Sequence, residues 1–224
     1  MKYIRFFVIV ISLLIFVNKT NAQSDHLEPI DGIFSIYNYE FDYYSKVRKV
    51  LFVGLTDPPE IRFLIVPSFT PENILDIEFD RKNNTYSLVY HICEKMIWDN
   101  KNWESTNVLE YRKEISKESV ELIKSLFKEA ISKTKYPDNE IIGLNGETYY
   151  VSKVDGEIYY FSNYEMGLKS GLVWSPSEGT KMDRLIKIGI EFIGLAKSDD
   201  NPVLLNDKLQ KEIVNLTNEL KQFP

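Results

Sequence analysis

The sequence predicts an α+β fold, an antiparallel meander with helices packed on one face and a C-terminal helical pair. Short alternating runs of apolar residues, separated by turn residues, predict neighbouring strands between residues 61 and 115. Apolar residues at spacings of three and four, each time after a hydroxyl cap, predict helices at 117–133 and 180–196. A chain of 224 residues can bury one sizeable core. We therefore expect one α+β domain over residues 23–198, with an amphipathic helix at 199–224 packed on it.

The meander is predicted strand by strand. Its expected strands are Ile61–Val66, Ile74–Arg81, Thr85–Ile97 and Asn107–Ile115. In the second strand, apolar side chains alternate with the carboxylates of Asp76, Glu78 and Asp80, which is typical of a strand buried on one face. These three carboxylates are therefore expected on a solvated outer face, where they are candidates for binding a partner.

The chain ahead of the meander is less regular. Residues 23–31 are expected to be a loose leader, and residues 32–39 a short strand. Residues 41–55 fit either a helix or a strand. We favour the helix because Tyr44 and Leu51 share its apolar stripe and Asp57-Pro58-Pro59 would end it.

The segment from Gly143 to Ala196 organises the C-terminal half. Asn-Gly and Asp-Gly each precede a run of β-branched and aromatic residues, and such pairs favour tight hairpin turns. Asp155-Gly156 is thus expected to join strands Glu147–Val154 and Glu157–Asn163 into a hairpin. A third strand, Leu168–Trp174, would complete a second short sheet. Thr180, with Asp183 three residues later, is a good N-cap for the helix that follows.

This segment resembles a pattern found in a loose set of uncharacterised bacterial proteins. The shared pattern is Gly-Leu-Asp/Asn-Gly, an aromatic residue, Trp-Ser-Pro, a glycine and then a hydrophobic helix. Here it reads Gly143-Leu144-Asn145-Gly146, Tyr149, Trp174-Ser175-Pro176, Gly179 and Leu185 to Gly189. The resemblance covers about a quarter of the chain and implies a shared fold unit without a known activity.

Residues 175–181 also raise the question of anion binding. Free main-chain amides at a helix start, together with hydroxyls and Lys181, are able to hold an anion. Helix capping explains the same residues, and the segment lacks the glycine and lysine spacing of a P-loop. Capping is the interpretation we favour.

The first 22 residues are expected to be a secretory signal peptide. Lys2 and Arg5 precede a short apolar run, and Ala22 offers a small residue for cleavage. Cleavage would also remove Lys19, so the formal net charge would move from −6 to −9. Such an acidic chain argues against a nucleic-acid partner or an anionic membrane surface. We expect an exported, soluble protein of the periplasm or exterior, without a lipid anchor.

Few residues suggest catalysis or metal binding. His91 and Cys93 share a strand face, and a thiolate beside a histidine can act as a nucleophile. A lone cysteine on a strand is more often a packing residue. His26 is the only other histidine, and no Cys/His spacing typical of a zinc site occurs. We therefore expect no cofactor and no metal, and no catalytic residue is identified.

The loop that carries Trp98 and Trp103 is the other candidate for partner binding. Two tryptophans around Asp-Asn-Lys-Asn are able to stack on a sugar or anchor a protein partner. The alternative is that both rings fold back onto the edge of the sheet.

Together these patterns favour an exported, non-catalytic protein that binds a macromolecular partner, as an inhibitor or immunity-like protein does. Two alternatives stay open: an envelope carbohydrate-binding module that uses the tryptophans, and an enzyme of unrecognised type.

Overall fold

The computed structural model describes residues 25–31, 38–98, 100–135, 141–142, 148–149, 156–167 and 169–222. The expected signal peptide at 1–22 lies outside these ranges. Among the described residues, no helix is both long enough and apolar enough to cross a membrane.

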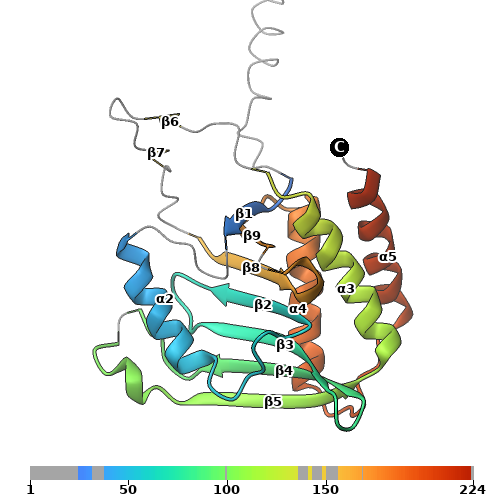
Figure 1. Cartoon of the computed structure of the whole chain (residues 1–224), viewed down its shortest axis with the longest axis horizontal. Coiled ribbons are helices and arrows are strands. Elements are labelled where there is room, and N and C mark those ends of the chain that lie inside the picture. Colours follow the sequence, from blue (N-terminus) through green and yellow to red (C-terminus); the bar gives the residue numbers. More distant parts are fainter. Residues whose placement is uncertain are drawn as a thin grey trace, which may run out of the picture.

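The core of the molecule is one seven-stranded sheet in which every neighbouring pair is antiparallel (Figure 1). Its order is β1-β9-β8-β2-β3-β4-β5. The strands are β1 (Glu28–Asp31), β2 (Ile61–Val66), β3 (Asn73–Asp80), β4 (Thr85–Cys93), β5 (Val108–Ile115), β8 (Ile158–Asn163) and β9 (Lys169–Trp174). Two short strands, β6 (Ile141–Ile142) and β7 (Thr148–Tyr149), pair only with each other. With the helices described below, this sheet confirms the predicted α+β class.

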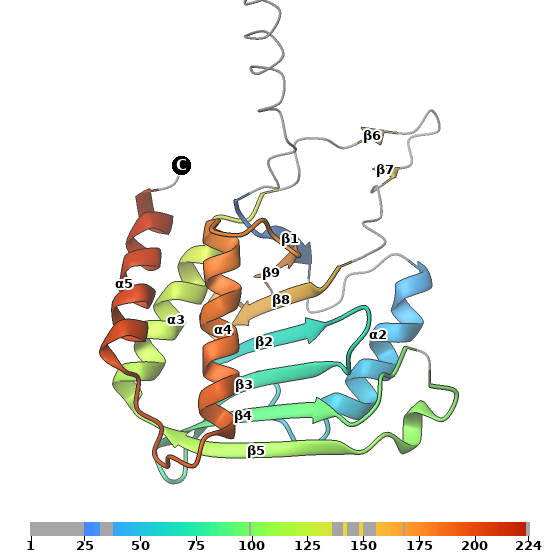
Figure 2. The same ribbon diagram turned by 180° about the vertical axis from the view of Figure 1, so that it is seen from behind.

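Helices cover both faces of the sheet, so the sheet is the middle of three layers (Figures 1 and 2). α3 (Lys117–Ser132), α4 (Lys181–Lys197) and α5 (Asp207–Gln222) pack on one face, where they form the larger apolar cluster. α2 (Asn38–Leu51) packs on the opposite face over a smaller cluster. The helix favoured for residues 41–55 is therefore confirmed, and it is the one α-helix on this side within the described residues.

The two apolar clusters explain why β2 is apolar at nearly every position. Phe63 and Ile65 point to the cluster under α4, while Leu64 and Val66 point to the cluster under α2. A strand covered on both faces needs apolar side chains on both. Arg62 is the exception, and its guanidinium is buried with 2% exposure.

The second sheet predicted for the C-terminal half is wrong. β8 pairs with β2 on one edge and with β9 on the other, so it belongs to the main sheet. Because both edges of β8 are occupied, the predicted hairpin across Asp155-Gly156 is not formed. Most of its first strand, Glu147–Val154, lies outside the described residues, and Thr148–Tyr149 pairs with Ile141–Ile142 instead.

The expected loose leader is also wrong for residues 28–31. They form the edge strand β1 on β9, and Leu27 just before it is fully buried. Residues 32–37 of the expected following strand lie outside the described residues, and Asn38 already begins α2.

Both predicted helix caps are confirmed. The hydroxyl of Ser116 accepts a hydrogen bond from the main-chain N–H of Ser119 at 3.2 Å. The hydroxyl of Thr180 accepts from the N–H of Asp183 at 3.2 Å, and Asp183 accepts from the N–H of Gly179 at 2.7 Å. These reciprocal bonds satisfy main-chain donors that would otherwise be left unpaired at the start of α4.

The start of α4 does hold an anion, and it comes from the chain itself. One carboxylate oxygen of Asp25 accepts from the N–H of Lys181 at 2.6 Å, and the other pairs with its ammonium at 2.7 Å. The residues considered for an external anion thus bind a carboxylate from the N-terminal segment.

The C-terminal segment is tied to the rest of the fold at two places. Arg184 of α4 pairs with Glu212 and Glu219 of α5 at 2.6 and 2.7 Å. Before α5, Val203 forms a parallel bridge to Ile115 at the end of β5. Residues 198–202 therefore lead into a segment that is anchored to the sheet.

Candidate functional site

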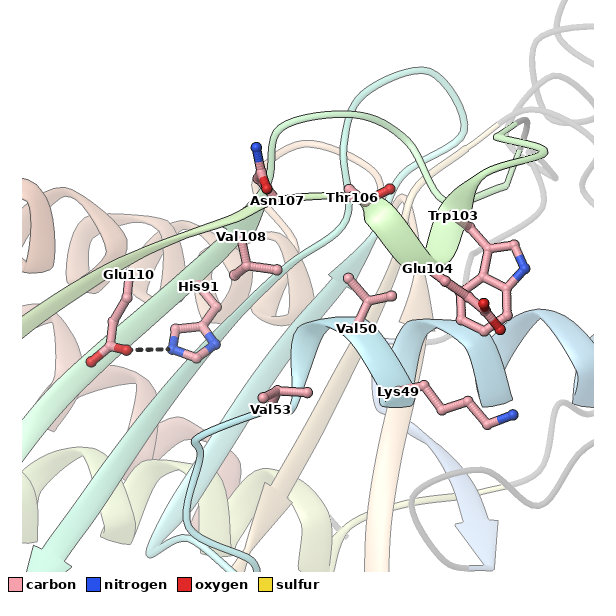
Figure 3. Close-up of a pocket in the computed structure, with 10 residues that line it drawn as sticks. All are labelled: Lys49, Val50, Val53, His91, Trp103, Glu104, Thr106, Asn107, Val108 and Glu110. Carbon is pink, nitrogen blue, oxygen red and sulfur yellow. Dashed lines mark ion pairs between the residues drawn. The ribbon is translucent and has the colours of Figure 1, made fainter.

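An open pocket of about 520 Å³ lies between α2, β4, β5 and the loop before β5 (Figure 3). Its volume is within the range of small-ligand sites. Val50, Val53 and Val108 supply apolar walls. His91 and Glu110 face each other at one end, and Trp103, the first residue of the short helix η1 (Trp103–Ser105), lies at the other end. The pocket thus combines an apolar wall with two different polar ends.

The hydrogen bonding of His91 defines one end of the pocket. Its Nδ1 lies 2.9 Å from the carbonyl oxygen of Leu51, the last residue of α2. A carbonyl only accepts, so Nδ1 carries the hydrogen. Nε2 lies 3.4 Å from Oε2 of Glu110 but has no hydrogen-bond partner within the described parts of the chain, although His91 is only 2% exposed.

This arrangement places the ring edge of His91 against the carboxylate of Glu110. The carboxylate of Glu110 is 47% exposed, so it can also accept a hydrogen bond from a group in the pocket. An O–H or N–H group of a ligand is a suitable donor. The hydrogen bond from Arg112 lowers the pKa of Glu110, which keeps that carboxyl an acceptor.

At the other end of the pocket, the ring of Trp103 lies near two lysine ammonium groups. The ammonium groups of Lys49 and Lys46 lie 5.8 and 6.0 Å from the centroid of the Trp103 ring, within cation–π range. Trp103 also packs against the apolar cluster under α2. Glu104 and Thr106 add polar groups at the rim. Trp103 is therefore partly folded back, as one interpretation held, while still lining the pocket.

Trp98 behaves differently from Trp103. It is 62% exposed, and its ring makes an edge contact with Tyr43 at 4.8 Å between centroids. It does not line the pocket. The two tryptophans predicted to act together therefore belong to different surfaces.

The position of this loop depends on Glu72, which sequence reasoning missed. Glu72 is fully buried, and its carboxylate accepts from the hydroxyl of Tyr43 at 2.7 Å and the N–H of Ile97 at 2.8 Å. It also accepts from the N–H of Trp98 at 3.3 Å. One carboxylate thereby joins α2 to the loops on either side of β3 and β4, and a buried acid after Pro71 gave no sequence pattern to reveal it.

The predicted open acidic face is wrong for two of its three residues. Asp76 is fully buried, Glu78 is 6% exposed, and only Asp80 lies in the solvent. The alternation along β3 was read correctly, but the polar side of the strand lies under the end of α2. Asp76 and Glu78 therefore bind groups of their own chain rather than presenting carboxylates to a partner.

The partners of Asp76 and Glu78 are two arginines. Asp76 accepts from Nε and Nη2 of Arg62 at 2.9 and 2.7 Å, a two-point ion pair. Glu78 pairs with Arg112 at 2.7 Å and accepts from the N–H of Thr56. Burial raises the pKa of Asp76 to about 6, although Arg62 acts in the opposite direction. Arg112 also pairs with Glu110 at 3.1 Å. The ion pairs of Glu78, Arg112 and Glu110 therefore extend to the pocket, which Glu110 lines.

Cys93 is not an activated nucleophile. It is 2% exposed, and burial together with the nearby Glu72 raises the pKa of its thiol to about 12. The thiol is therefore protonated at neutral pH. His91 shares its strand face but is bonded to Leu51. Within the described ranges, no three His, Cys, Asp or Glu side chains are placed to hold a metal ion.

Comparison with known proteins identifies no relative: no protein-family model, curated protein or solved structure matches the chain. The function of the site is therefore argued from its geometry.

Proposed function

We propose that the protein is an exported binding protein whose pocket between α2 and β5 takes a saccharide. The observation that carries the proposal is the combination of two different ends in one pocket, the 47% exposed carboxylate of Glu110 and the ring of Trp103. A hydroxyl of a sugar is a neutral donor that can bond to the carboxylate of Glu110.

The rest of the pocket supports this ligand class. A sugar ring has an apolar C–H face, for which Trp103 and the valines offer matching surface. Glu104, Glu110 and Asn107 provide acceptors and an amide for further hydroxyls, and only Lys49 among the lining residues carries a fixed positive charge. Two carboxylates against one ammonium disfavour phosphorylated ligands.

The test is a calorimetric titration of the protein with neutral oligosaccharides and with peptidoglycan fragments. Glu110→Gln keeps the side-chain volume but removes the charged acceptor, so we expect roughly tenfold weaker binding or more. Trp103→Ala should weaken binding to a similar degree. Trp98→Ala is the matched control because Trp98 belongs to the same loop outside the pocket. No heat with any saccharide would refute the proposal.

A second candidate is binding of a macromolecular partner, as in an inhibitor or immunity-like protein. Trp98 is 62% exposed and Phe69 79% exposed, and both lie on loops at the same end of the sheet. Exposed aromatic side chains are common anchors in protein interfaces. In an affinity capture from the cell envelope, this candidate predicts that Trp98→Ala loses a partner that Trp103→Ala retains.

A further inference from the structure

The outer edge of β5 carries main-chain groups that no described residue bonds. Glu114 donates its N–H to Asn201 at 2.9 Å and accepts from the N–H of Val203 at 2.7 Å, so its main-chain groups face away from β4. Facing direction alternates along an antiparallel strand. The N–H and C=O groups of Val108, Glu110 and Arg112 therefore face outward as well, and no described residue bonds them. Figures 1 and 2 show β5 as the border of the sheet.

This edge is complementary to itself in one register. When two copies of β5 run antiparallel with a two-fold axis at Tyr111, Glu110 of each copy lies opposite Arg112 of the other. Both residues have outward-facing main-chain groups, so the two pairs would exchange four main-chain hydrogen bonds. Each pair also brings opposite charges together across the strands.

The neighbouring registers are disfavoured by the same charges. A slip of two residues in one direction places Glu110 opposite Glu110, and a slip in the other direction places Arg112 opposite Arg112. Like charges directly opposite each other destabilise a strand pair. The contacts of Glu114 with Asn201 and Val203 close the edge beyond Lys113. Charged residues that protect an edge strand from unrelated strands thus select one partner here.

We propose that β5 pairs with β5 of a second copy of this chain, which joins two seven-stranded sheets across a two-fold axis. Such an isologous interface closes on itself and gives a dimer. Arg112 of the second copy would then lie opposite Glu110, at the rim of the pocket. The dimer does not require a bound saccharide, although Glu110 contributes to both proposals, so the dimer is tested at Leu109 and Lys113, which do not line the pocket.

The oligomeric state of the purified protein tests the pairing. Light scattering after size exclusion should give twice the mass of the purified chain at micromolar concentrations, and that mass is 26.2 kDa when all 224 residues are present. In the proposed register, Leu109 lies opposite Lys113 of the second copy. Leu109 is 45% exposed, so its replacement leaves the core intact. Leu109→Lys places like charges opposite each other twice and should raise the dimer dissociation constant roughly tenfold.

A compensating substitution separates this register from a general loss of association. Lys113→Glu added to Leu109→Lys restores opposite charges and should return the dissociation constant to the range of the unmodified protein. In hydrogen exchange, the amides of Glu110 and Arg112 should become protected as concentration rises, whereas those of Leu109 and Tyr111, which face β4, should be protected throughout. A monomer at all concentrations, or a dimer that ignores Leu109→Lys, would overturn the proposal.

Discussion

At the scale of single residues, two buried carboxylates link segments that are separate in the sequence. Glu72 and Asp76 are both fully buried, yet each carboxylate is saturated with donors. Burying a charged group is costly unless hydrogen bonds or an opposite charge compensate. Because Glu72 serves three segments at once, its removal would leave several buried donors without acceptors.

We therefore predict that Glu72→Ala lowers the free energy of unfolding by about 3 kcal/mol, since buried donors left unsatisfied cost about 1–3 kcal/mol each. Urea unfolding monitored by tryptophan fluorescence would measure it. Glu94→Ala is the control, because Glu94 is an exposed acid with a single contact, to Asn107. It should change stability by no more than about 0.5 kcal/mol. Equal losses in the two variants would contradict the role of Glu72.

In β3, the alternation of acidic residues predicts which side of the strand they occupy but not whether that side is buried. The period of two correctly put Asp76, Glu78 and Asp80 on one side of the strand. Whether that side meets solvent depends on α2, which arrives from a distant part of the sequence, and on Arg62 in the neighbouring strand. A charged residue inside the apolar run Ile61–Val66 was the available signal, because a buried charge needs an opposite charge nearby.

At the scale of elements, close packing between α4 and β2 limits which side chains each can carry. A Cβ atom on Gly189 would lie 2.5 Å from the ring of Phe63, whereas one on Gly194 would meet no atom within 4 Å. Both glycines lie in α4, so they share the same helical backbone and differ only in their surroundings. The absence of a side chain at Gly189 thus allows α4 to approach the sheet.

This contrast gives a matched pair of substitutions. Gly189→Ala should lower the free energy of unfolding by about 1–3 kcal/mol, because the added methyl group forces Phe63 to move. Gly194→Ala should raise it by about 0.5–1 kcal/mol, since alanine loses less conformational entropy in a helix. Thermal and urea unfolding measure both. If Gly189→Ala were also stabilising, the tight contact with Phe63 would be wrong.

Helices and strands were predicted correctly where residues close together in the sequence determine them. The capped helices and the strands between residues 61 and 115 follow from spacing, caps and turns in adjacent residues. The pairing of β8 with β2 joins residues such as Tyr159 and Ile65, which are far apart in the sequence. β1 was missed because a four-residue edge strand containing Pro29 has no periodic pattern to reveal it.

At the scale of the whole molecule, the C-terminal helix is part of the main core. Leu216 and Ile213 of α5 are fully buried in the same cluster as β2 and α4. A helix that shares its core with the sheet should not unfold separately. We therefore expect tryptophan fluorescence and circular dichroism to report one coincident unfolding transition.

Leu216→Ala should lower the free energy of that single transition by about 3 kcal/mol, because a buried leucine leaves a cavity when truncated. Val214→Ala, two residues earlier in the same helix, should cost no more than about 0.5 kcal/mol, because Val214 is 42% exposed. Two separate transitions in the Leu216→Ala variant would show instead that α5 docks on a domain that folds without it.

The contact between Asp25 and the start of α4 limits how far the N-terminus can be shortened without loss of that ion pair. Cleavage after Ala22 would leave Gln23 and Ser24 ahead of Asp25, and the carboxylate would stay on the N–H and ammonium of Lys181. An aminopeptidase that also removed Asp25 would take away the carboxylate that binds the N–H and the ammonium of Lys181 at the start of α4. The expected cleavage site after Ala22 thus lies only three residues before an aspartate that stabilises the start of α4.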